Sequence, residues 1–253
     1  MVRGFYSAAS GILSRQKAID VISHNIANVT TAGYKSQATA ESSFGEHLVS
    51  RMGPSAKTSE SNIGPGSFMT VNAEVYTDFA QGTLEHTGRS VDMAILGEGF
   101  FVIENEKHGE VLTRNGQFEL DDNGDLILPG VGKVQNDGGR GINLKNTNFT
   151  VGADGAILVD GKEEERLYIA TGEDNSVFTK AGEDFFKVEG GWRKADKETY
   201  RAAQGYIEKA NVNMAKEMSR IIAGQNHFQS CAQVLKIYDK INEISVNRIG
   251  NIG

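Results

Sequence analysis

The sequence has few cysteine and histidine residues, which form disulfides and structural metal sites. Cys231 is the only cysteine among the 253 residues, so no disulfide can form within the chain. It follows His227 by four residues, but two ligands do not make a structural zinc site. No two histidines lie three or four residues apart. We therefore expect neither a metal nor another cofactor.

Long apolar runs and a positive net charge are also absent. The longest apolar runs, such as residues 99–103, fall far short of the ~20 residues that a membrane-spanning helix needs. The N-terminal segment lacks the compact apolar region of a cleaved signal peptide. The formal net charge is −7, whereas general nucleic-acid binders carry clustered lysine and arginine. The composition thus argues against membrane insertion and against nucleic acid as a partner, and favours either a cytoplasmic protein or export without a cleaved signal.

Motifs that support catalysis or nucleotide binding are incomplete. Residues 97–99 (Gly-Glu-Gly) lack the third glycine of a dinucleotide fingerprint and precede strand-forming residues. A calcium loop starting at Asp121 needs glycine and glutamate where the chain has Leu126 and Gly132. No Gly-x-Ser-x-Gly elbow occurs. These absences do not by themselves exclude catalysis.

Apolar residues recur at helical spacing at both ends of the chain. Between Phe5 and Ile26, six of seven positions spaced alternately by three and four are apolar, and the same holds from Met214 to Leu235. This spacing is typical of coiled-coil helices. Because no proline follows Pro129, the second helix can extend for about 30–35 residues, or roughly 45–50 Å.

Boundary signals support both helices. Thr30, Thr31 and Gly33 favour an end to the first helix, and Gly33 is expected to adopt a conformation that other residues disfavour. Either Asn211 or Asn213 can cap the start of the second helix by accepting a backbone N–H bond. A helix with so narrow an apolar stripe is not stable alone. The partner could be the other terminal helix, neighbouring subunits, or both.

The middle of the chain reads as β-structure. Between residues 68 and 190, short runs of Val, Ile, Phe and Leu alternate with Asn-Gly and Asp-Gly pairs, which are strong hairpin signals. Residues 120–126 and 151–161 each predict a strand, a tight turn and a second strand. Residues 36–67, rich in Ser, Thr, Gly and Glu, predict an irregular or extended connector.

These patterns predict an α+β fold in which long N- and C-terminal helices pair as a coiled coil around a β-rich central domain. We assign residues 1–35 and 206–253 to the helical domain, 36–75 to an extended connector and 76–205 to a β-rich outer domain.

The segment after the first helix carries a specific motif. Asn25 and Asn28 are followed by Thr31 and then by Gly-Tyr-Lys at residues 33–35. This pattern resembles the N-terminal motif of the flagellar hook and rod axial family. Residues 76–102 and 112–118 are similar to the central block of that family, and residues 210–228 to the start of its C-terminal helix. The order and spacing match rod proteins better than hook proteins, whose chains carry larger middle insertions.

Two positions depart from the family pattern. The family often has asparagine where this chain has His24, and aspartate where it has Asn213. Asn213 keeps the ability to cap a helix, and His24 keeps hydrogen-bonding capacity. Neither departure alters the resemblance.

The resemblance implies a structural subunit of the bacterial flagellar basal-body rod, and not an enzyme. It implies helical polymerisation through the terminal helices, which would line an export channel, with other rod and hook axial proteins as partners. It also implies export beyond the cytoplasmic membrane by the flagellar type III apparatus, which needs no cleaved signal. The alternatives are a secreted binding or adhesin module built on the β domain and a hydrolase or lyase with a β core. Deleting the terminal helices would abolish function only if the chain is a rod subunit.

The residues expected at subunit interfaces are the helix stripes and the family motif. The stripes could instead form only an intramolecular hairpin, and the Asn and Thr positions of the motif could be only a local helix stop. The expected interface residues are Phe5, Ile12, Ile19, Ile22, Asn25, Ile26, Asn28, Thr31, Gly33, Tyr34, Lys35, Asn211, Met214, Met218, Ile221, Phe228 and Leu235.

Overall fold

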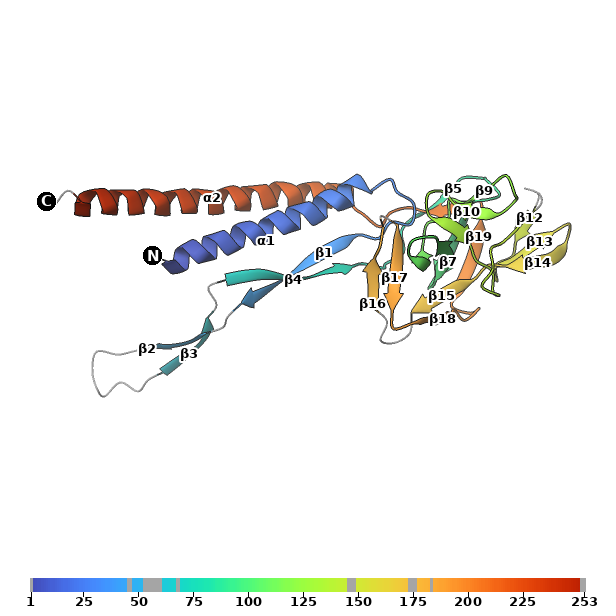
Figure 1. Ribbon diagram of the computed structural model, residues 1–253, viewed down its shortest axis with the longest axis horizontal. Helices are drawn as coiled ribbons and strands as arrows, with labels where there is room; N and C mark the ends of the chain where they lie inside the picture. The colour runs from blue at the N-terminus through green and yellow to red at the C-terminus, as the bar shows by residue number, and fades with distance from the viewer. Residues whose placement is uncertain are drawn as a thin grey trace. The chain divides into compact units, whose positions relative to one another are not determined.

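The computed structural model describes residues 2–44, 47–51, 61–66, 69–144, 149–172, 177–182 and 184–250. The chain forms two compact units. The helical unit contains residues 1–26, 37–78 and 213–253, and the β unit contains residues 27–36 and 79–212. The predicted α+β class is confirmed, with one helix at each end and strands between them (Figure 1). The three-part division drawn from the sequence stays a prediction.

The two long helices lie at the predicted places. Helix α1 spans Val2–Ala27 and helix α2 spans Met214–Gly250, 37 residues and slightly longer than expected. The Oδ1 atom of Asn213 accepts a hydrogen bond from the backbone N–H of Lys216 at 3.0 Å. Asn213 is therefore the N-cap of α2, and Asn211 is not. No described helix is long and apolar enough to cross a membrane.

Helices α1 and α2 contact each other in antiparallel directions, as Figure 1 shows. A Cβ atom added at Gly4 would lie 2.0 Å from Tyr238 Oη, and one added at Gly11 would lie 3.3 Å from Cys231 Sγ. Farther along, a Cβ at Gly224 would lie 3.1 Å from Ile19 Cγ1. Contacts thus recur at about seven-residue intervals on both helices, with small residues where they approach most closely.

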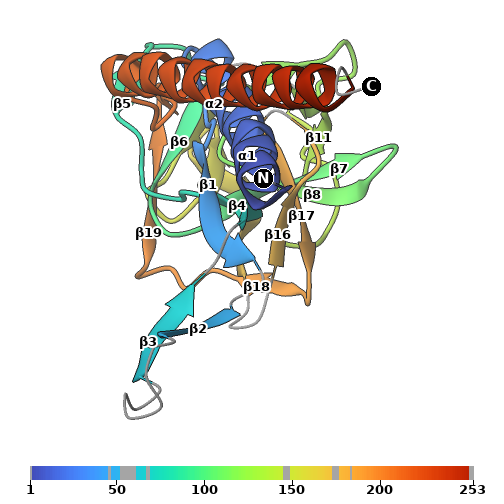
Figure 2. The same cartoon turned by 90° about the vertical axis from the view of Figure 1, so that its left-hand side faces the viewer.

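The remainder of the helical unit is a β ribbon. Strand β1 (Gln37–Phe44) pairs antiparallel with β4 (Met69–Thr77), and β2 (His47–Arg51) pairs with β3 (Ser61–Gly66) (Figure 2). The described part of the predicted connector is therefore extended and paired in strands. Pairing satisfies the backbone N–H and C=O groups of a segment whose polar sequence gave little sign of a sheet.

The β unit is antiparallel throughout its described strand pairs, which include the hairpins predicted at residues 120–126 and 151–161. Its largest sheet has the order β16-β17-β8-β7-β11-β10-β9, and β15 joins β7 to β18. Three further groups are β12-β13-β14, β19-β6 and β20-β5. The strands are β5 Leu84–His86, β6 Met93–Gly97, β7 Phe100–Asn105, β8 Gly109–Thr113, β9 Glu119–Leu120, β10 Leu126–Leu128, β11 Gly132–Val134, β12 Phe149–Val151, β13 Ala156–Val159, β14 Lys162–Arg166, β15 Ile169–Gly172, β16 Val177–Lys180, β17 Phe185–Glu189, β18 Trp192–Lys194, β19 Tyr200–Gln204 and β20 Tyr206–Glu208.

The core of the β unit is fully formed within the chain. Met93, Ile95, Phe101, Ile103 and Phe118 have no exposed surface. The rings of Phe101 and Phe118 meet edge to face, with centroids 5.1 Å apart. Alternate side chains of β6 and β7 supply this core, because successive side chains of a strand point to opposite faces of the sheet. A second apolar cluster around Phe100 and Phe186 lies on the other side of β7.

Candidate functional site

The family motif begins where α1 ends. The backbone N–H of Thr31 donates to Asn28 O at 3.1 Å, and Thr31 Oγ1 donates to Asn28 Oδ1 at the same distance. Gly33 then has φ of 69°, which confirms the expectation of a left-handed conformation. A Cβ atom at Gly33 would also lie 2.2 Å from the backbone nitrogen of Asn115. The position therefore requires glycine for both conformation and space.

Asn25 joins the last turns of α1 to the ribbon within the helical unit. Its Nδ2 group donates to Gln37 O at 2.8 Å, and its Oδ1 atom accepts from Gln37 N at 2.9 Å. The side chain is 1% exposed. An amide has both a donor and an acceptor, so it can bond both backbone groups of one residue. Asn25 thus has a defined role inside the chain.

A buried ion cluster lies in the β unit. Lys35 Nζ is 2.7 Å from Glu208 Oε1, and Arg114 Nη1 is 3.2 Å from Glu208 Oε2. The side chains of Lys35 and Glu208 are each 1% exposed. We call these three residues the motif cluster. Removing one partner of a buried ion pair leaves an uncompensated charge, so each partner is held in place. The cluster therefore ties Lys35, the last residue of the family motif, to Glu208 of β20.

Arg114 lies deep in this cluster. Burial lowers the pKa of its guanidinium from the ordinary value, and the nearby Glu208 carboxylate opposes that shift. Its Nη2 group donates to Gly97 O at 2.7 Å, and the guanidinium carbon lies 5.1 Å from the centre of the Phe100 ring. Arginine remains charged at any pH a protein tolerates. The cluster therefore holds two cations around one carboxylate.

Three chain segments meet at the motif cluster. Residues 27–36 connect α1 to β1 in the sequence, and residues 79–82 follow β4. Residues 208–212 precede α2. Lys35 Nζ donates to Ala80 O at 2.9 Å, and Glu208 Oε1 accepts from Gly82 N at 2.8 Å. Asn211 Oδ1 accepts from Ser36 N at 2.7 Å, and its Nδ2 group donates to Ala80 O. Asn211 thus joins these segments, where the sequence allowed it to be a helix cap.

Tyr34 completes the burial of the motif. It has no exposed surface, and Lys180 Nζ lies 3.8 Å from the centre of its ring. Asn28 and Lys35 are 8% and 1% exposed. Asn25, Asn28, Tyr34 and Lys35 are therefore buried by the chain itself in this conformation. The sequence hypothesis that the motif contacts another subunit is untested, whereas its contacts inside the chain are now defined.

The stripe residues of the helices behave differently. Phe5 and Met218 are 41% and 49% exposed. The other expected interface residues on the stripes are half-buried, and they include Ile19, which packs against Gly224. Their role in subunit contacts stays a prediction. The half-buried stripe residues are Ile12, Ile19, Ile22, Ile26, Met214, Ile221, Phe228 and Leu235.

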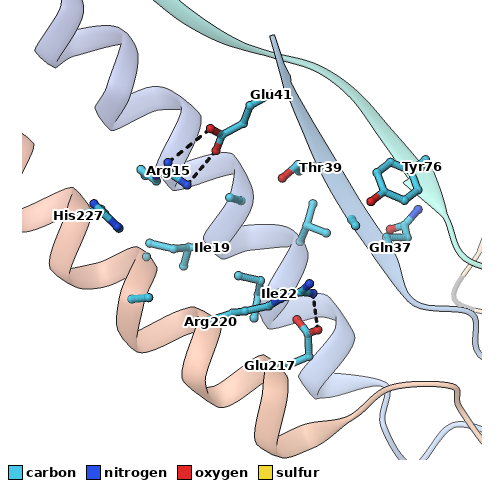
Figure 3. Close-up of a pocket in the computed structure, with 15 residues that line it drawn as sticks. Arg15, Ile19, Ile22, Gln37, Thr39, Glu41, Tyr76, Glu217, Arg220 and His227 are labelled. Atoms are coloured by element: carbon cyan, nitrogen blue, oxygen red, sulfur yellow. Dashed lines mark hydrogen bonds and ion pairs between the residues drawn. The ribbon is translucent and has the colours of Figure 1, made fainter.

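A pocket of about 480 Å³ lies within the helical unit, between α1, α2 and the β1–β4 ribbon (Figure 3). Arg15 Nη1 lies 2.8 Å from Glu41 Oε1, and Arg220 Nη1 lies 2.8 Å from Glu217 Oε1. The side chain of Glu217 is 6% exposed, and its Oε2 atom has no hydrogen-bond partner among the described residues. Among those residues, no group of three or more His, Cys, Asp or Glu side chains is arranged to hold a metal ion. The lining offers ion pairs and aliphatic walls.

Three structurally important residues were not among those expected from the sequence. Glu208 is a single acidic residue in a strand-like segment, and nothing local marks it as buried. Arg114 and Glu217 fall within blocks that resemble the family, which was the only available signal. Their partners lie 94 and 3 residues away. Pairing over the longer distance requires the folded chain.

Three family models of flagellar rod and hook proteins match successive segments of the chain. Residues 5–35 match the family model described as flagella basal body rod protein, residues 94–159 match the flagellar hook protein FlgE/F/G D1 domain, and residues 203–249 match the flagellar basal body rod FlgEFG protein C-terminal region. The first matched segment contains the buried motif, and the third contains Glu208 and most of α2.

Similar proteins align over nearly their whole length. Flagellar basal-body rod protein FlgG of Bacillus subtilis (strain 168) is 29% identical over 265 residues, covering 98% of this chain and 99% of that protein. Flagellar basal-body rod protein FlgF of Caulobacter vibrioides is 27% identical over 256 residues, covering all of both chains. FlhO of Bacillus subtilis, a flagellar hook-basal body complex protein, is 26% identical over 276 residues, again covering both chains fully.

Proposed function

The chain belongs to the flagellar basal-body rod protein family, and from this premise we propose how it works as a structural subunit of the rod. Its terminal helices pair as a coiled coil and drive helical polymerisation into the axial drive shaft, which encloses the export channel. The subunit carries out no catalysis and needs no cofactor. Its neighbours are further copies and other rod and hook proteins.

The observation that supports this proposal is that the helical unit leaves large apolar side chains exposed to solvent. Apolar side chains such as Met218 and Ile237 are 49% and 58% exposed on α2. Large exposed apolar surfaces mark interaction sites in soluble proteins. An open helical polymer forms by repeated heterologous contacts, and each subunit must then carry complementary faces that are incomplete in the monomer.

The coiled-coil pairing of α1 and α2 is supported by the repeat of their contacts. Gly4 and Gly11 on α1 are seven residues apart, as are Gly224, Cys231 and Tyr238 on α2. A seven-residue repeat of contacts is the geometry of a two-helix seam. Small residues at the seam bring the helices close, and Asn25 anchors the end of α1 to the ribbon.

We place the assembled subunit in the flagellar basal body, beyond the cytoplasmic membrane. The chain would reach this place through the flagellar export apparatus. A secreted binding module built on the β unit was the second hypothesis. The related proteins give it no support.

The proposal is tested by placing a charge in the helix pair. Ile22→Asp or Phe228→Asp should block polymerisation while the β unit stays folded, because each replaces a half-buried apolar side chain with a carboxylate. Assembly would be followed by sedimentation and electron microscopy, and β folding by circular dichroism. Gln229→Asp, at an exposed position of α2, is the matched control and should assemble normally. Normal assembly of the Ile22 and Phe228 variants, or loss of the β fold, would count against the proposal.

A further inference from the structure

A second apolar stripe lies on the C-terminal half of α2. Val234, Ile237, Ile241 and Ile244 are spaced by three, four and three residues, so they share one face of the helix. They are 41%, 58%, 44% and 45% exposed. Large aliphatic side chains exposed side by side differ from the isolated apolar residues that any surface carries. We call these four residues the outer ridge.

The outer ridge is distinct from the face of α2 that contacts α1. That face contains Gly224, Cys231 and Tyr238, which lie against α1 residues. At about 100° per residue, the ridge is turned from it by little more than a quarter of a turn. A helix with two apolar stripes needs a partner for each stripe. Helix α1 of the same chain covers one of them.

The outer ridge continues a stripe of exposed residues that line the pocket nearer the start of α2. The same face of α2, two or more turns before the ridge, carries Arg220, Ala223 and His227. These three residues line the pocket between α2, α1 and the ribbon. The stripe changes from polar or small to aliphatic after Ser230. The ridge therefore continues the α2 wall of this pocket toward the C-terminal end of the helix.

Helix α1 carries an apolar face of similar length. Tyr6 and Leu13 are 54% and 67% exposed, and Ala9 lies between them on the same side. This face is about half a turn away from Gly4 and Gly11, which contact α2. Because it points away from the α2 of its own chain, it cannot meet the outer ridge within one molecule.

We propose that the outer ridge of α2 binds the Tyr6–Leu13 face of α1 in a second copy of this chain. The two surfaces differ, so the contact is heterologous and repeats without closing, as a rod requires. Gly4 lies against Tyr238, so both surfaces belong to the same end of the helix pair. This inference rests on the proposed function and names which parts of the helices bind which.

The test uses two full-length variants, each with one surface disabled. Ile237→Asp with Ile241→Asp disables the outer ridge, and Leu13→Asp disables the α1 face. Each variant alone should stay monomeric in sedimentation, with at least a ~30-fold rise in the concentration needed for assembly. Mixed in equal amounts, they should form a one-to-one dimer that grows no further, because one intact surface of each kind remains. Gln229→Asp, at an exposed polar position of α2 outside the ridge, is the control and should assemble normally.

The alternatives give different results. Polymerisation of either variant alone like the wild type would overturn the inference. So would dimerisation of the Leu13→Asp variant alone, which would mean that two ridges pair with each other. A mixture that stays monomeric while the wild type forms rods would also refute it. If Phe228→Asp still blocks assembly in any of these cases, the inference fails but the proposed function stands. If the Phe228→Asp variant also assembles normally, the inference and the proposed function both fail.

Discussion

The β unit and the helical unit bury their apolar side chains to different extents. In the β unit, Phe101, Ile103 and Phe118 are fully buried by the chain itself. Among the described residues, ten of the fifteen large apolar side chains that are exposed lie on α1 or α2. The β unit thus buries its apolar side chains on folding, whereas the helices leave many of theirs exposed. Under the proposed function, folding and assembly are assigned to separate parts of one chain.

Polar contacts follow the same division. The motif cluster pairs Lys35, Arg114 and Glu208 at positions that are almost fully buried, whereas the Arg15–Glu41 pair of the helical unit has side chains 36% and 32% exposed. Exposed ion pairs contribute about 0–1 kcal/mol, whereas breaking a buried pair costs about 3–5 kcal/mol. Loss of the buried pair should therefore destabilise the β unit, whereas loss of the Arg15–Glu41 pair should change the stability of the helical unit little.

The largest expected effect comes from Glu208→Leu. It leaves the charges of Lys35 and Arg114 buried without their carboxylate, so the free energy of unfolding of the β unit should fall by about 3–5 kcal/mol. Urea unfolding followed by circular dichroism measures this loss. The control is Glu85→Gln, on the neighbouring strand, where Glu85 pairs with Lys209 at 2.6 Å but is 48% exposed. A control as destabilised as the Glu208 variant would show that burial does not distinguish the two pairs.

A smaller loss is expected from Gly33→Ala. Alanine disfavours φ of 69°, and its Cβ atom would lie 2.2 Å from Asn115 N, so the backbone must shift at a cost of roughly 2–3 kcal/mol. Gly109→Ala is the matched control, with φ of 71° and no atom within 4 Å of the added carbon. It should cost only about 1 kcal/mol. Equal losses in thermal or urea unfolding would mean that the contact with Asn115 does not matter.

Asn25→Ala should weaken the helical unit and leave the β unit unchanged. It removes both hydrogen bonds to Gln37, each worth about 0.5–1.5 kcal/mol. Hydrogen exchange should become faster at the end of α1 and the start of β1 and stay the same in β7 and β8. Gln16→Ala, at an exposed position of α1, is the control. Faster exchange throughout the β unit would contradict the independence of the two units.

The smallest effect concerns pH. The hydrogen bond from Asn143, followed by the one from Lys133, lowers the pKa of Asp125 below its ordinary value. A lowered carboxyl pKa contributes stability that is complete above the unfolded pKa and is lost as pH falls through the folded one. Asn143→Ala should therefore reduce the free energy of unfolding by less than about 1 kcal/mol at pH 7, and the difference should shrink toward pH 2–3, where only the lost bond to Asn123 O contributes. Urea unfolding at several pH values measures this, and a difference that grows with acidity would be the wrong sign.

Local patterns predicted much of the fold. The helix stripes, the Asn-Gly and Asp-Gly hairpins and the left-handed Gly33 depend on neighbouring residues, and all were found. The β1–β4 pairing was not foreseen, because Ala38 and Tyr76 become partners only across a long insertion. Short polar strands carry little signal of their own, since their pairing depends on distant residues.

The candidate site was predicted less completely. The motif residues from Asn25 to Lys35 were found from the family pattern, but their partners Arg114 and Glu208 lie far along the chain and could not be identified by spacing. The apolar pattern of α2 was found, including its shift onto Tyr238, Ile241 and Ile244, whereas Val234 and Ile237 were not identified as part of a separate ridge. A stripe identified from spacing alone does not show which of its residues face the chain and which face outward.

The central claim is that α1 and α2 are completed only by further copies, whereas the β unit is complete alone. Hydrogen exchange of the full chain, compared between dilute monomer and assembled rods, tests it most directly. The account predicts slow exchange in β7 and β8 in both states, and slow exchange around Val234–Ile244 only in the assembly. Equal protection of that part of α2 in the monomer at every concentration would contradict it.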